Sequence, residues 1–472
     1  MTLKARIRAI DRFVKGCRED GIYGDLTACC VMAGWDSLAG ALTPLKGTAP
    51  TNSGFLDADL DRGIGLKGNG STKYLNSNRA GNADGQNDRH VSVFLGDRGT
   101  AGGGARYIAS GSSASYDTFI NNLSAGSVIS AVSNPSYDTV AYSGGGFLGS
   151  KRSISTSFDF RVGGTTTPFS RTSGTPNAEN FGIFCRSIGD LAFSNARLSY
   201  YSIGSATDLA LLEARVSTLM ADLRAIEEAG FDRDAIGYLR AVEEADGAYL
   251  ETSVKIAINN LVSGLKADNL WESMASTCLL SGPRTLAGAL VPLKGDAPTA
   301  YGFVDGDYDR EGLTGDGSSY LDSNRANDAD PQNNHHLAAY CSSGTLSAGE
   351  YIIGTTDTAT PTFSLAGYRA YSRSTGAEGA LGGGAGLYAV SRSSGSGFSY
   401  TQASGSVTFV GKASVAISIS QNSLVFAYAN GSGSASGVSN DKISFYSIGT
   451  SLDLAKLDSH VSAYVTAIGA AL

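Results

Sequence analysis

The chain has 472 residues, of which 61 are glycine, and Lys, Arg, Asp and Glu together make up only 17%. This balance is typical of a loop-rich β protein and disfavours a helical bundle, while a formal net charge of -8 leaves no uniform basic surface for a nucleic-acid backbone. No apolar run is long enough to cross a bilayer and the first residues lack the apolar core of a signal peptide, so we expect no membrane insertion and a soluble protein made in a cytoplasm.

The sequence contains a long internal repeat. Leu38–Leu42 returns as Leu286–Leu290 after 248 positions, and Tyr201–Gly204 returns as Tyr446–Gly449 after 245. Such a self-match indicates a duplicated folding unit, and each copy is long enough to bury its own core. We therefore predict four segments: residues 1–26, an N-terminal helical segment; 27–223, a first β-sandwich with a terminal helix; 224–271, a helical linker; and 272–472, a second β-sandwich with a C-terminal helix.

A helix is predicted before each β body. Before the second body, apolar residues recur at spacings of three and four, the period of one apolar helix face. They are Leu250, Val254, Ala257, Leu261 and Leu265. The first copy is expected to keep only a stub of this helix between residues 5 and 23. Residues 224–249, with two Glu-Glu pairs and two glycines, are predicted to be solvated helical connectors.

Within the bodies the apolar period changes to two, which predicts strands with one buried and one exposed face. Examples are Ile154, Thr156, Phe158, Phe160 and Val162 in the first copy and Val415, Ile417 and Ile419 in the second. Glycine clusters between such runs supply turns, and Tyr74 and Tyr320 are predicted to occupy core positions. These patterns favour a mainly β fold with two tandem antiparallel β-sandwich domains, each flanked by α-helices.

A second helix is predicted after each body. Its apolar positions again recur at spacings of three and four. They are Leu209, Leu212, Val216, Leu219 and Leu223 in the first copy and Leu454, Leu457, Val461, Val465, Ile468 and Leu472 in the second. Because the pattern lasts under three heptads, we favour an amphipathic helix folded onto its own sandwich. The alternative is a short trimeric coiled coil.

Two aspartate triplets are the most conspicuous polar motif. They are Asp57, Asp59 and Asp61 in the first copy and Asp305, Asp307 and Asp309 in the second. Alternating carboxylates can supply some of the six to eight oxygens that calcium requires, which makes them weak metal candidates. An EF-hand loop would need glycine directly after the third acid, whereas Arg62 and Arg310 stand there. A solvated turn or an Asp–Arg pair is the favoured interpretation, and we expect no metal and no cofactor.

Three further motifs have structural interpretations. Gly68–Ser71 and Gly315–Ser318 predict hairpin turns and not phosphate cradles, since no Lys-Ser/Thr pair follows. The equivalent His90 and His336 are predicted to bond a neighbouring loop. The six cysteines are too irregularly spaced for a disulfide framework and are predicted to be buried, reduced thiols. They are Cys17, Cys29, Cys30, Cys185, Cys278 and Cys341.

Catalysis is not expected. Enzymes that cut polysaccharides use a close pair of Asp or Glu, but glutamate is scarce in the bodies. The glutamates there are Glu179 in the first copy and Glu311, Glu350 and Glu378 in the second. None has a glutamate at the equivalent position of the other copy. The sequence also contains no recognisable pattern of a Ser-His-Asp catalytic triad or of a nucleophile elbow.

Two recurring segments resemble a known family. Gly65–Leu75 and Gly312–Leu321 look like the opening strand of laminin-G-like, concanavalin A-like jelly-roll sandwiches, and Tyr200–Gly204 and Phe445–Gly449 resemble the last strand of that family. Together with the helix ending in Leu265–Trp271, the combination is similar to structural proteins encoded by tailed phages and prophages. The resemblance implies a virion protein whose sandwiches serve in adhesion, receptor binding or decoration.

The sequence therefore predicts a phage virion protein, made in the host cytoplasm, that acts as a tail fibre or tail-tip adhesion component. The alternative is a capsid decoration or head-fibre protein, and a polysaccharide-degrading enzyme is the least favoured interpretation. We expect other virion proteins and a host-surface glycan or protein as partners, no nucleic acid, and a homo-oligomer, with a trimer as one form. Recognition is predicted in residues 96–190 and 342–430, where the two copies diverge.

Overall fold

The computed structural model describes residues 3–100, 103–111, 117–124, 126–186, 192–343, 349–356, 362–366, 369–374, 384–403, 405–416 and 420–472. It divides into two compact units. Module 1 comprises residues 1–230 and 247–252, and module 2 comprises residues 231–246 and 253–472. No helix in the described ranges is long and apolar enough to span a membrane.

Module 1 is a sandwich of two antiparallel sheets. The helix-side sheet, which the helices cover, has the order β13-β12-β11-β6-β15-β4-β3, and β1 also pairs with β15. Its strands are β1 (Leu26–Val31), β3 (Leu60–Asp61), β4 (Gly65–Lys67), β6 (Arg89–Asp97), β11 (Gly146–Arg152), β12 (Ser157–Val162), β13 (Thr165–Ser170) and β15 (Arg197–Gly204). The open sheet, which lies away from the helices, has the order β10-β9-β8-β7-β14-β5-β2. Its strands are β2 (Thr51–Ser53), β5 (Tyr74–Ala80), β7 (Arg106–Ser110), β8 (Asp117–Ser124), β9 (Ser127–Asn134), β10 (Asp138–Ala141) and β14 (Asn180–Ile183).

Module 2 repeats this plan. Its helix-side sheet has the order β17-β16-β32-β22-β26-β27-β28, with β19 and β20 attached through β32. Its strands are β16 (Met274–Leu279), β17 (Pro292–Lys294), β19 (Tyr308–Asp309), β20 (Gly312–Thr314), β22 (His335–Ser343), β26 (Gly386–Arg392), β27 (Phe398–Thr401), β28 (Thr408–Val410) and β32 (Lys442–Gly449). The open sheet has the order β18-β21-β29-β23-β24-β25, with β30 and β31 attached through β23. Its strands are β18 (Thr299–Tyr301), β21 (Tyr320–Ala326), β23 (Tyr351–Thr355), β24 (Thr362–Ala366), β25 (Arg369–Ser374), β29 (Asn422–Val425), β30 (Tyr428–Ala429) and β31 (Ala435–Ser436).

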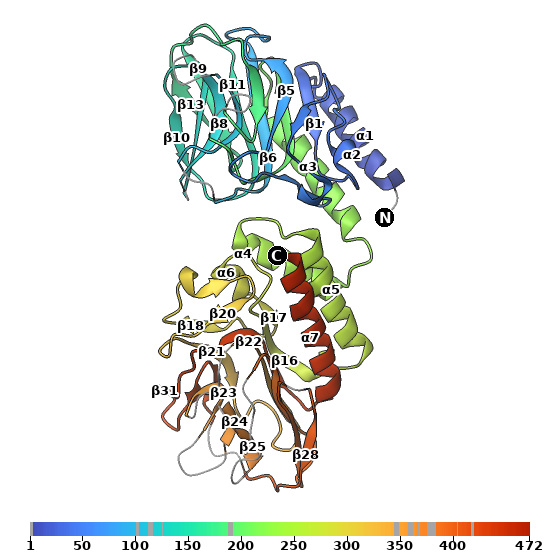
Figure 1. Cartoon of the computed structure of the whole chain (residues 1–472), viewed down its shortest axis with the longest axis vertical. Helices are drawn as coiled ribbons and strands as arrows, with labels where there is room; N and C mark the ends of the chain where they lie inside the picture. Colours follow the sequence, from blue (N-terminus) through green and yellow to red (C-terminus); the bar gives the residue numbers. More distant parts are fainter. Residues whose placement is uncertain are drawn as a thin grey trace. The chain divides into compact units, whose positions relative to one another are not determined.

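The helices are α1 (Leu3–Glu19), α2 (Leu38–Ala41) and α3 (Leu209–Glu227), followed by α4 (Arg233–Asp246), α5 (Thr252–Ala267), α6 (Leu286–Ala289) and α7 (Leu454–Ala471). In each module a pair of long helices forms an outer layer on the helix-side sheet, α1 with α3 and α5 with α7 (Figure 1). Short 3-10 turns are η1 (Asp57–Asp59), η2 (Trp271–Ser273) and η3 (Asp305–Asp307). The predicted mainly β fold of antiparallel sandwiches with flanking helices is confirmed.

Local chemistry explains where these elements begin. Asp208 and Asp453 cap α3 and α7, because each carboxylate accepts hydrogen bonds from two backbone N–H groups of the first turn. In β12, Phe158, Phe160 and Val162 alternate with half-exposed residues and point into the core, as the period of two predicts. Ile154 lies before this strand and is 54% exposed, so the predicted alternation extended too far. The matching run at Ile417 and Ile419 lies outside the described residues.

The leading helix of module 1 is not a stub. α1 has 17 residues, against 16 for α5. Its Ala9, Phe13 and Cys17 are buried against the outer face of the helix-side sheet and against α3. The short apolar face was missed because Arg6 takes a buried position on it, paired with Asp36.

Residues 231–246 are not solvated connectors. α4 belongs to module 2, where Tyr238, Leu239 and Val242 are buried. Asp246 at the end of α4 accepts hydrogen bonds from the backbone N–H groups of Arg284 and Thr285 at the start of α6. This apolar face was not predicted because charged residues are interspersed with the apolar ones along α4.

The helices after each body pack on their own sandwich. In α3, Leu212, Val216 and Leu219 are buried with residues of the helix-side sheet. In α7, Leu454, Leu457 and Val461 are likewise buried. The favoured prediction of a helix folded onto its own sandwich is confirmed for these residues, while Leu472 at the end of the second pattern is 50% exposed.

The two glycine turns do not close hairpins. Gly68–Ser71 leads from β4 in the helix-side sheet to β5 in the open sheet, and Gly315–Ser318 likewise leads from β20 to β21. A Cβ on Gly68 would lie 2.0 Å from the carbonyl oxygen of Ser194, so glycine is needed for a close approach of two backbones. The hairpin prediction was wrong because β4 and β5 pair with distant strands and not with each other.

Candidate functional site

The aspartate triplet of module 1 is dispersed among structural contacts. Asp57 Oδ1 accepts a hydrogen bond from the backbone N–H of Leu38 at 2.7 Å, where α2 begins. Asp59 forms an ion pair with Lys73 at 2.5 Å. Asp61 accepts hydrogen bonds from backbone N–H groups of the following turn. The three carboxylates therefore serve three different local contacts.

In the aspartate triplet of module 2, two of the three carboxylates also accept hydrogen bonds from nearby backbone N–H groups. Asp307 accepts a hydrogen bond from the backbone N–H of Val304 at 2.8 Å, and Asp309 accepts one from Gly312 at 3.2 Å. Asp305 begins η3. Throughout the described ranges, no group of three or more His, Cys, Asp or Glu side chains is placed to hold a metal ion.

The two arginines that follow the triplets bind groups outside the triplets. Arg62 Nε binds Glu227 Oε2 at 2.8 Å, and Arg310 Nη2 donates to the carbonyl oxygen of Gly282 at 2.9 Å. Arg62 thus binds an acceptor on α3, later in the chain, and Arg310 binds an acceptor earlier in the chain. Both acceptors are buried. The other interpretation, a turn stabilised by the carboxylates, fits the backbone contacts of Asp61 and Asp309.

The predicted structural histidines are confirmed. His90 Nδ1 lies 2.6 Å from the carbonyl oxygen of Ser205 and its Nε2 lies 2.9 Å from Ser202 Oγ. His336 makes the same two contacts, with Thr450 and Ser447. Burial lowers the pKa of both rings, that of His336 to about 4. Both are therefore neutral at pH 7 and tie the loop before α3 or α7 to the sheet.

All six cysteines are buried and free, as predicted. Cys30 Sγ and Cys278 Sγ each lie 3.1 Å from a carbonyl oxygen, that of Ala41 and that of Ala289. Of the four glutamates in the bodies, Glu378 lies outside the described residues. Glu311 lies 3.6 Å from Lys442 Nζ, and its side chain is 66% exposed.

The outer face of the open sheet in module 1 carries a polar pair. Arg106 on β7 and Asn121 on β8 stand opposite each other in the strand register. Phe119, two residues before Asn121, lies beneath the guanidinium, whose central carbon is 3.9 Å from the ring centroid. Both polar residues fall in the divergent middle, yet neither was singled out, because isolated Arg and Asn carry no motif. A comparison of the two copies could have indicated this position, because Tyr351 in module 2 stands where Arg106 stands in module 1.

In this pair Asn121 is buried and Arg106 is half-buried, and both side chains lack hydrogen-bond partners among the described residues. Asn121 is 1% exposed. Within the described part of the chain, Nε and Nη1 of Arg106 and both amide atoms of Asn121 have no hydrogen-bond partner. Burial lowers the pKa of Arg106 to about 10, with Asp117 opposing the shift, so the side chain stays cationic at pH 7. A half-buried cation and a buried amide thus lie side by side on the outer face of the open sheet.

The open sheet of module 2 carries tyrosines instead. Tyr301 on the edge strand β18 stacks on Tyr320 with ring centroids 4.8 Å apart and planes 13° apart, and Tyr301 is 46% exposed. Tyr351 and Tyr428 form a second pair at 4.3 Å. Tyr320 is half-buried, as is Tyr74, so their prediction as core residues was wrong; the strand alternation points Leu75 and Leu321 inward instead.

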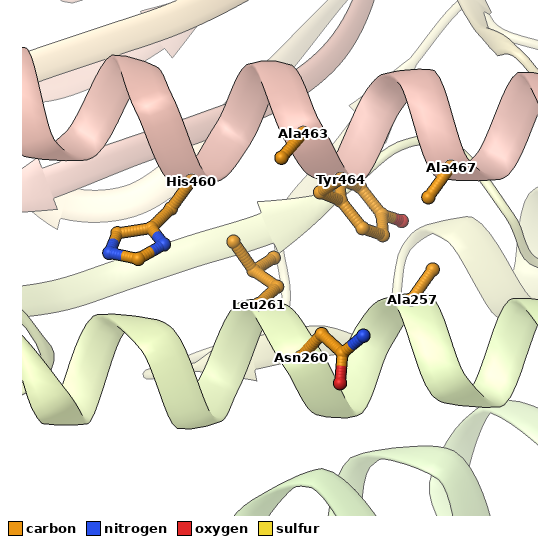
Figure 2. A pocket seen from close by; sticks show the side chains of 7 residues that line it. All are labelled: Ala257, Asn260, Leu261, His460, Ala463, Tyr464 and Ala467. Atoms are coloured by element: carbon orange, nitrogen blue, oxygen red, sulfur yellow. The ribbon is translucent and has the colours of Figure 1, made fainter.

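A groove of about 200 Å³ lies between α5 and α7 in module 2 (Figure 2). It is lined by Ala257, Asn260, Leu261, His460, Ala463, Tyr464 and Ala467. At one end His460 Nε2 lies 2.7 Å from Asp268. Tyr464 donates a hydrogen bond from its hydroxyl to the carbonyl oxygen of Ser281 at 2.6 Å. The groove is therefore mostly small and apolar, with its tyrosine already bonded to the sheet.

The same helix pair is filled in module 1. Phe13 is 3% exposed at the position of Leu261, and Arg12 forms an ion pair with Asp222 at 2.7 Å. The equivalent positions in module 2 hold Asn260 and Ala467. We therefore attribute the groove to smaller side chains in the second copy.

A comparison with protein-family models found no match, and a comparison with curated proteins found none either. Among solved structures, the chain is similar to the receptor binding domain of a botulinum neurotoxin C/D mosaic serotype at 10% identity, covering 91% of this chain and 98% of that one, with a TM-score of 0.31. It is similar to a Trypanosoma rangeli sialidase mutant displaying trans-sialidase activity at 11% identity, covering 46% of this chain and 39% of the sialidase, with a TM-score of 0.30.

A third similarity is to domain 4 of an extracellular arabinanase from Geobacillus stearothermophilus in complex with arabinotriose. The identity is 12%, the coverage is 42% of this chain and 99% of that domain, and the TM-score is 0.26. Similarity at this level does not identify what the chain binds.

Proposed function

We propose that this chain is a surface-adhesion protein that binds glycans through the open sheets of its two modules. The observation that carries the proposal is the exposed stack of Tyr301 on Tyr320 at a sheet edge. An aromatic face is electron-rich and attracts the polarised C–H groups of a sugar ring. Tyrosine adds a large contact area at a low cost in conformational entropy.

The difference between the modules supports recognition on this face. Both helix-side sheets keep equivalent buried contacts, such as those of His90 and His336. The open sheets present Arg106 and Asn121 in module 1 and tyrosine pairs in module 2. The packed helices constrain the helix-side sheet, whereas the outer face of the open sheet lies away from these helices and is freer to diverge toward different ligands.

We further propose that the protein belongs to the virion of a tailed bacteriophage, as a tail fibre or tail-tip component. The motifs that resemble phage structural proteins support this location. Gold-labelled antibody against the chain, viewed on intact particles by electron microscopy, tests it. Label at the tail tip supports the proposal, label on the head favours the decoration alternative, and unlabelled particles would overturn a virion role.

The proposed binding activity is that of a receptor-binding protein and not of an enzyme. Acidic side chains of the sandwich bodies take part in ion pairs, such as Asp138 with Arg171 at 2.7 Å and Asp84 with Arg79. A catalytic carboxylate pair would instead have to face an open substrate site. Incubating the protein with the glycans that it binds and measuring reducing ends tests this point, and release of new reducing ends would contradict it.

Tyr301→Ser tests the binding site. It installs the residue of module 1, where Ser53 stands at the equivalent position opposite Tyr74. We expect at least a tenfold loss of affinity for neutral oligosaccharides on a glycan array and in calorimetry, with an unchanged melting temperature because Tyr301 is half-exposed. Tyr137→Ser, at a tyrosine that is 52% exposed in module 1, is the matched control. Equal binding by Tyr301→Ser and the wild type would refute this site.

A further inference from the structure

We propose that module 1 binds the carboxylate of an acidic sugar between Arg106 and Asn121 on its open sheet. The inference rests on the proposed glycan-binding function and names the ligand class for one of the two modules. It starts from a contrast between Arg106, which is half-buried, and the buried arginines of module 1.

Several buried arginines of module 1 satisfy backbone carbonyls, whereas the buried Arg6 pairs with the carboxylate of Asp36. Arg152 Nε donates to the carbonyl oxygen of Val132 at 2.7 Å, and its Nη1 donates to that of Arg171 at 2.8 Å. Arg89 donates to the carbonyl oxygen of Gly81 at 2.7 Å. These arginines hold loops together. The guanidinium of Arg106 makes no such bond to any residue in the described ranges and rests on the Phe119 ring.

Asn121 supplies the second, independent observation. Its amide is almost fully buried, yet neither its oxygen nor its nitrogen has a partner among the described residues. Buried polar groups in folded proteins are nearly always satisfied, so an exception calls for an explanation. Because Asn121 stands opposite Arg106 in the register of β7 and β8, one ligand can complete both groups.

The hydrogen-bond donors and acceptors of Arg106 and Asn121 indicate which class of ligand fits the site. A guanidinium binds a carboxylate through two parallel hydrogen bonds. The amide of Asn121 adds one acceptor and two donors, which suit the hydroxyl groups next to the carboxylate of a uronic or sialic acid. A neutral sugar cannot form the charge-assisted hydrogen bonds that a carboxylate forms with Arg106, whose nearby acidic side chain is Asp117, so the site favours the acid.

Module 2 does not repeat this site. The residues that stand opposite each other at the corresponding register positions of β23 and β24 are Tyr351 and Ala366. Neither residue carries the positive charge that Arg106 supplies in module 1. The acidic-sugar site therefore belongs to module 1 alone, while the stacked tyrosines of module 2 suit neutral rings.

Calorimetric titration of the full chain tests the assignment. The probes are oligogalacturonate, oligoglucuronate and N-acetylneuraminic acid, together with the neutral methyl ester of each and with sulfate as a simple anion. We expect at least one acid to bind, its methyl ester to bind at least tenfold more weakly, and sulfate not to compete. Absence of binding by all three acids, equal binding of the esters, or full competition by sulfate would overturn the proposal.

Variants locate the site. Arg106→Met and Asn121→Leu should each weaken binding of the acid at least tenfold with little change in melting temperature, because neither side chain gives up a hydrogen bond and Arg106 loses only its contact with the Phe119 ring and its attraction to Asp117. Arg369→Met, at an exposed arginine on the open sheet of module 2, makes the same change in net charge and should bind normally. Retained binding by Arg106→Met, or a lower melting temperature for both variants, would show that the pair is structural.

The two proposals fail separately. If the acids do not bind but neutral oligosaccharides still bind in a Tyr301-dependent way, only the acidic-sugar site is lost. If neither class of sugar binds, the glycan-binding function itself is refuted.

Discussion

Arg89 and Arg373 bind equivalent carbonyl groups in their own modules from different strands. Arg89 on β6 and Arg373 on β25 each satisfy three backbone oxygens of one loop. The acceptors are those of Gly81, Asp84 and Gly85 for Arg89 and those of Asn327, Asp330 and Pro331 for Arg373, all displaced by 246 positions. The position of Arg89 in module 2 is His335, which lies 3.0 Å from Arg373. The duplicated loop thus needs a buried guanidinium, whichever strand supplies it.

Removing either arginine should destabilise its module. Arg89→Met and Arg373→Met each leave buried carbonyls without a donor, so we expect a loss of about 3 kcal/mol in the free energy of unfolding. Urea unfolding followed by tryptophan and tyrosine fluorescence measures it. Arg106→Met is the control and should lose at most about 1 kcal/mol, from its contact with the Phe119 ring. A loss below about 1 kcal/mol for Arg89→Met would contradict the role assigned to the loop.

The leading helix of module 1 should be essential to that module. Phe13→Ala removes a ring that is 3% exposed and packs against Tyr200 with centroids 6.1 Å apart, so we expect a loss of about 3–5 kcal/mol. Leu3→Ala, at a residue that is 60% exposed on the same helix, should change stability by less than about 0.5 kcal/mol. Similar losses for both variants would mean that α1 frays from the sheet.

Stability should fall in mild acid because of His336. Its folded-state pKa of about 4 lies below the ordinary value of 6.5, so the unfolded chain binds a proton that the folded chain does not bind. The contribution is therefore complete above about pH 6.5 and is lost as the pH falls toward 4, by about 3 kcal/mol in all. We expect His336→Asn to flatten this part of the curve of unfolding free energy against pH. Parallel curves for the variant and the wild type would be the contrary result.

The helix groove of module 2 should accept a larger side chain. Leu261→Phe installs the residue of module 1 and should raise stability by about 0.5–1 kcal/mol, because it fills part of the space beside Ala463 and Ala467. The reciprocal Phe13→Leu should lower stability, since it opens a cavity in a filled helix pair. Thermal unfolding of both variants measures the two changes, and a destabilised Leu261→Phe would mean that the groove cannot widen for the ring.

Removal of divalent metal should leave the fold unchanged. Asp57, Asp59 and Asp61 already serve backbone N–H groups and Lys73, so they have little capacity left for a cation. We expect EDTA to move the melting temperature by less than about 1 °C, well below the few degrees that 1 kcal/mol gives in a domain of this size. A fall of about 10 °C, reversed by calcium, would identify a metal site.

Local patterns in the sequence were sufficient for several features of this protein. The alternation of Phe158, Phe160 and Val162 determined a strand with one buried face. The repeated His90 and His336 were predicted as structural because each precedes an apolar strand, and both bond the loop that follows the last strand. The period of the helices after each body determined which side is buried. These features depend on residues that are close in sequence. The sequence of one copy is therefore enough to predict them.

Tertiary structure decided the rest. The predicted hairpins at Gly68 and Gly315 join different sheets, because strand pairing depends on partners more than a hundred positions away. Arg106 and Asn121 become a pair only when β7 and β8 align in one register, and the carbonyl oxygens that Arg373 satisfies lie more than forty positions before it. Hydrogen bonds and burial are long-range properties of the folded chain. Residue type and spacing therefore determined which segments form strands and helices, and only the packing of the two sheets determined which polar side chains are satisfied and which remain for a ligand.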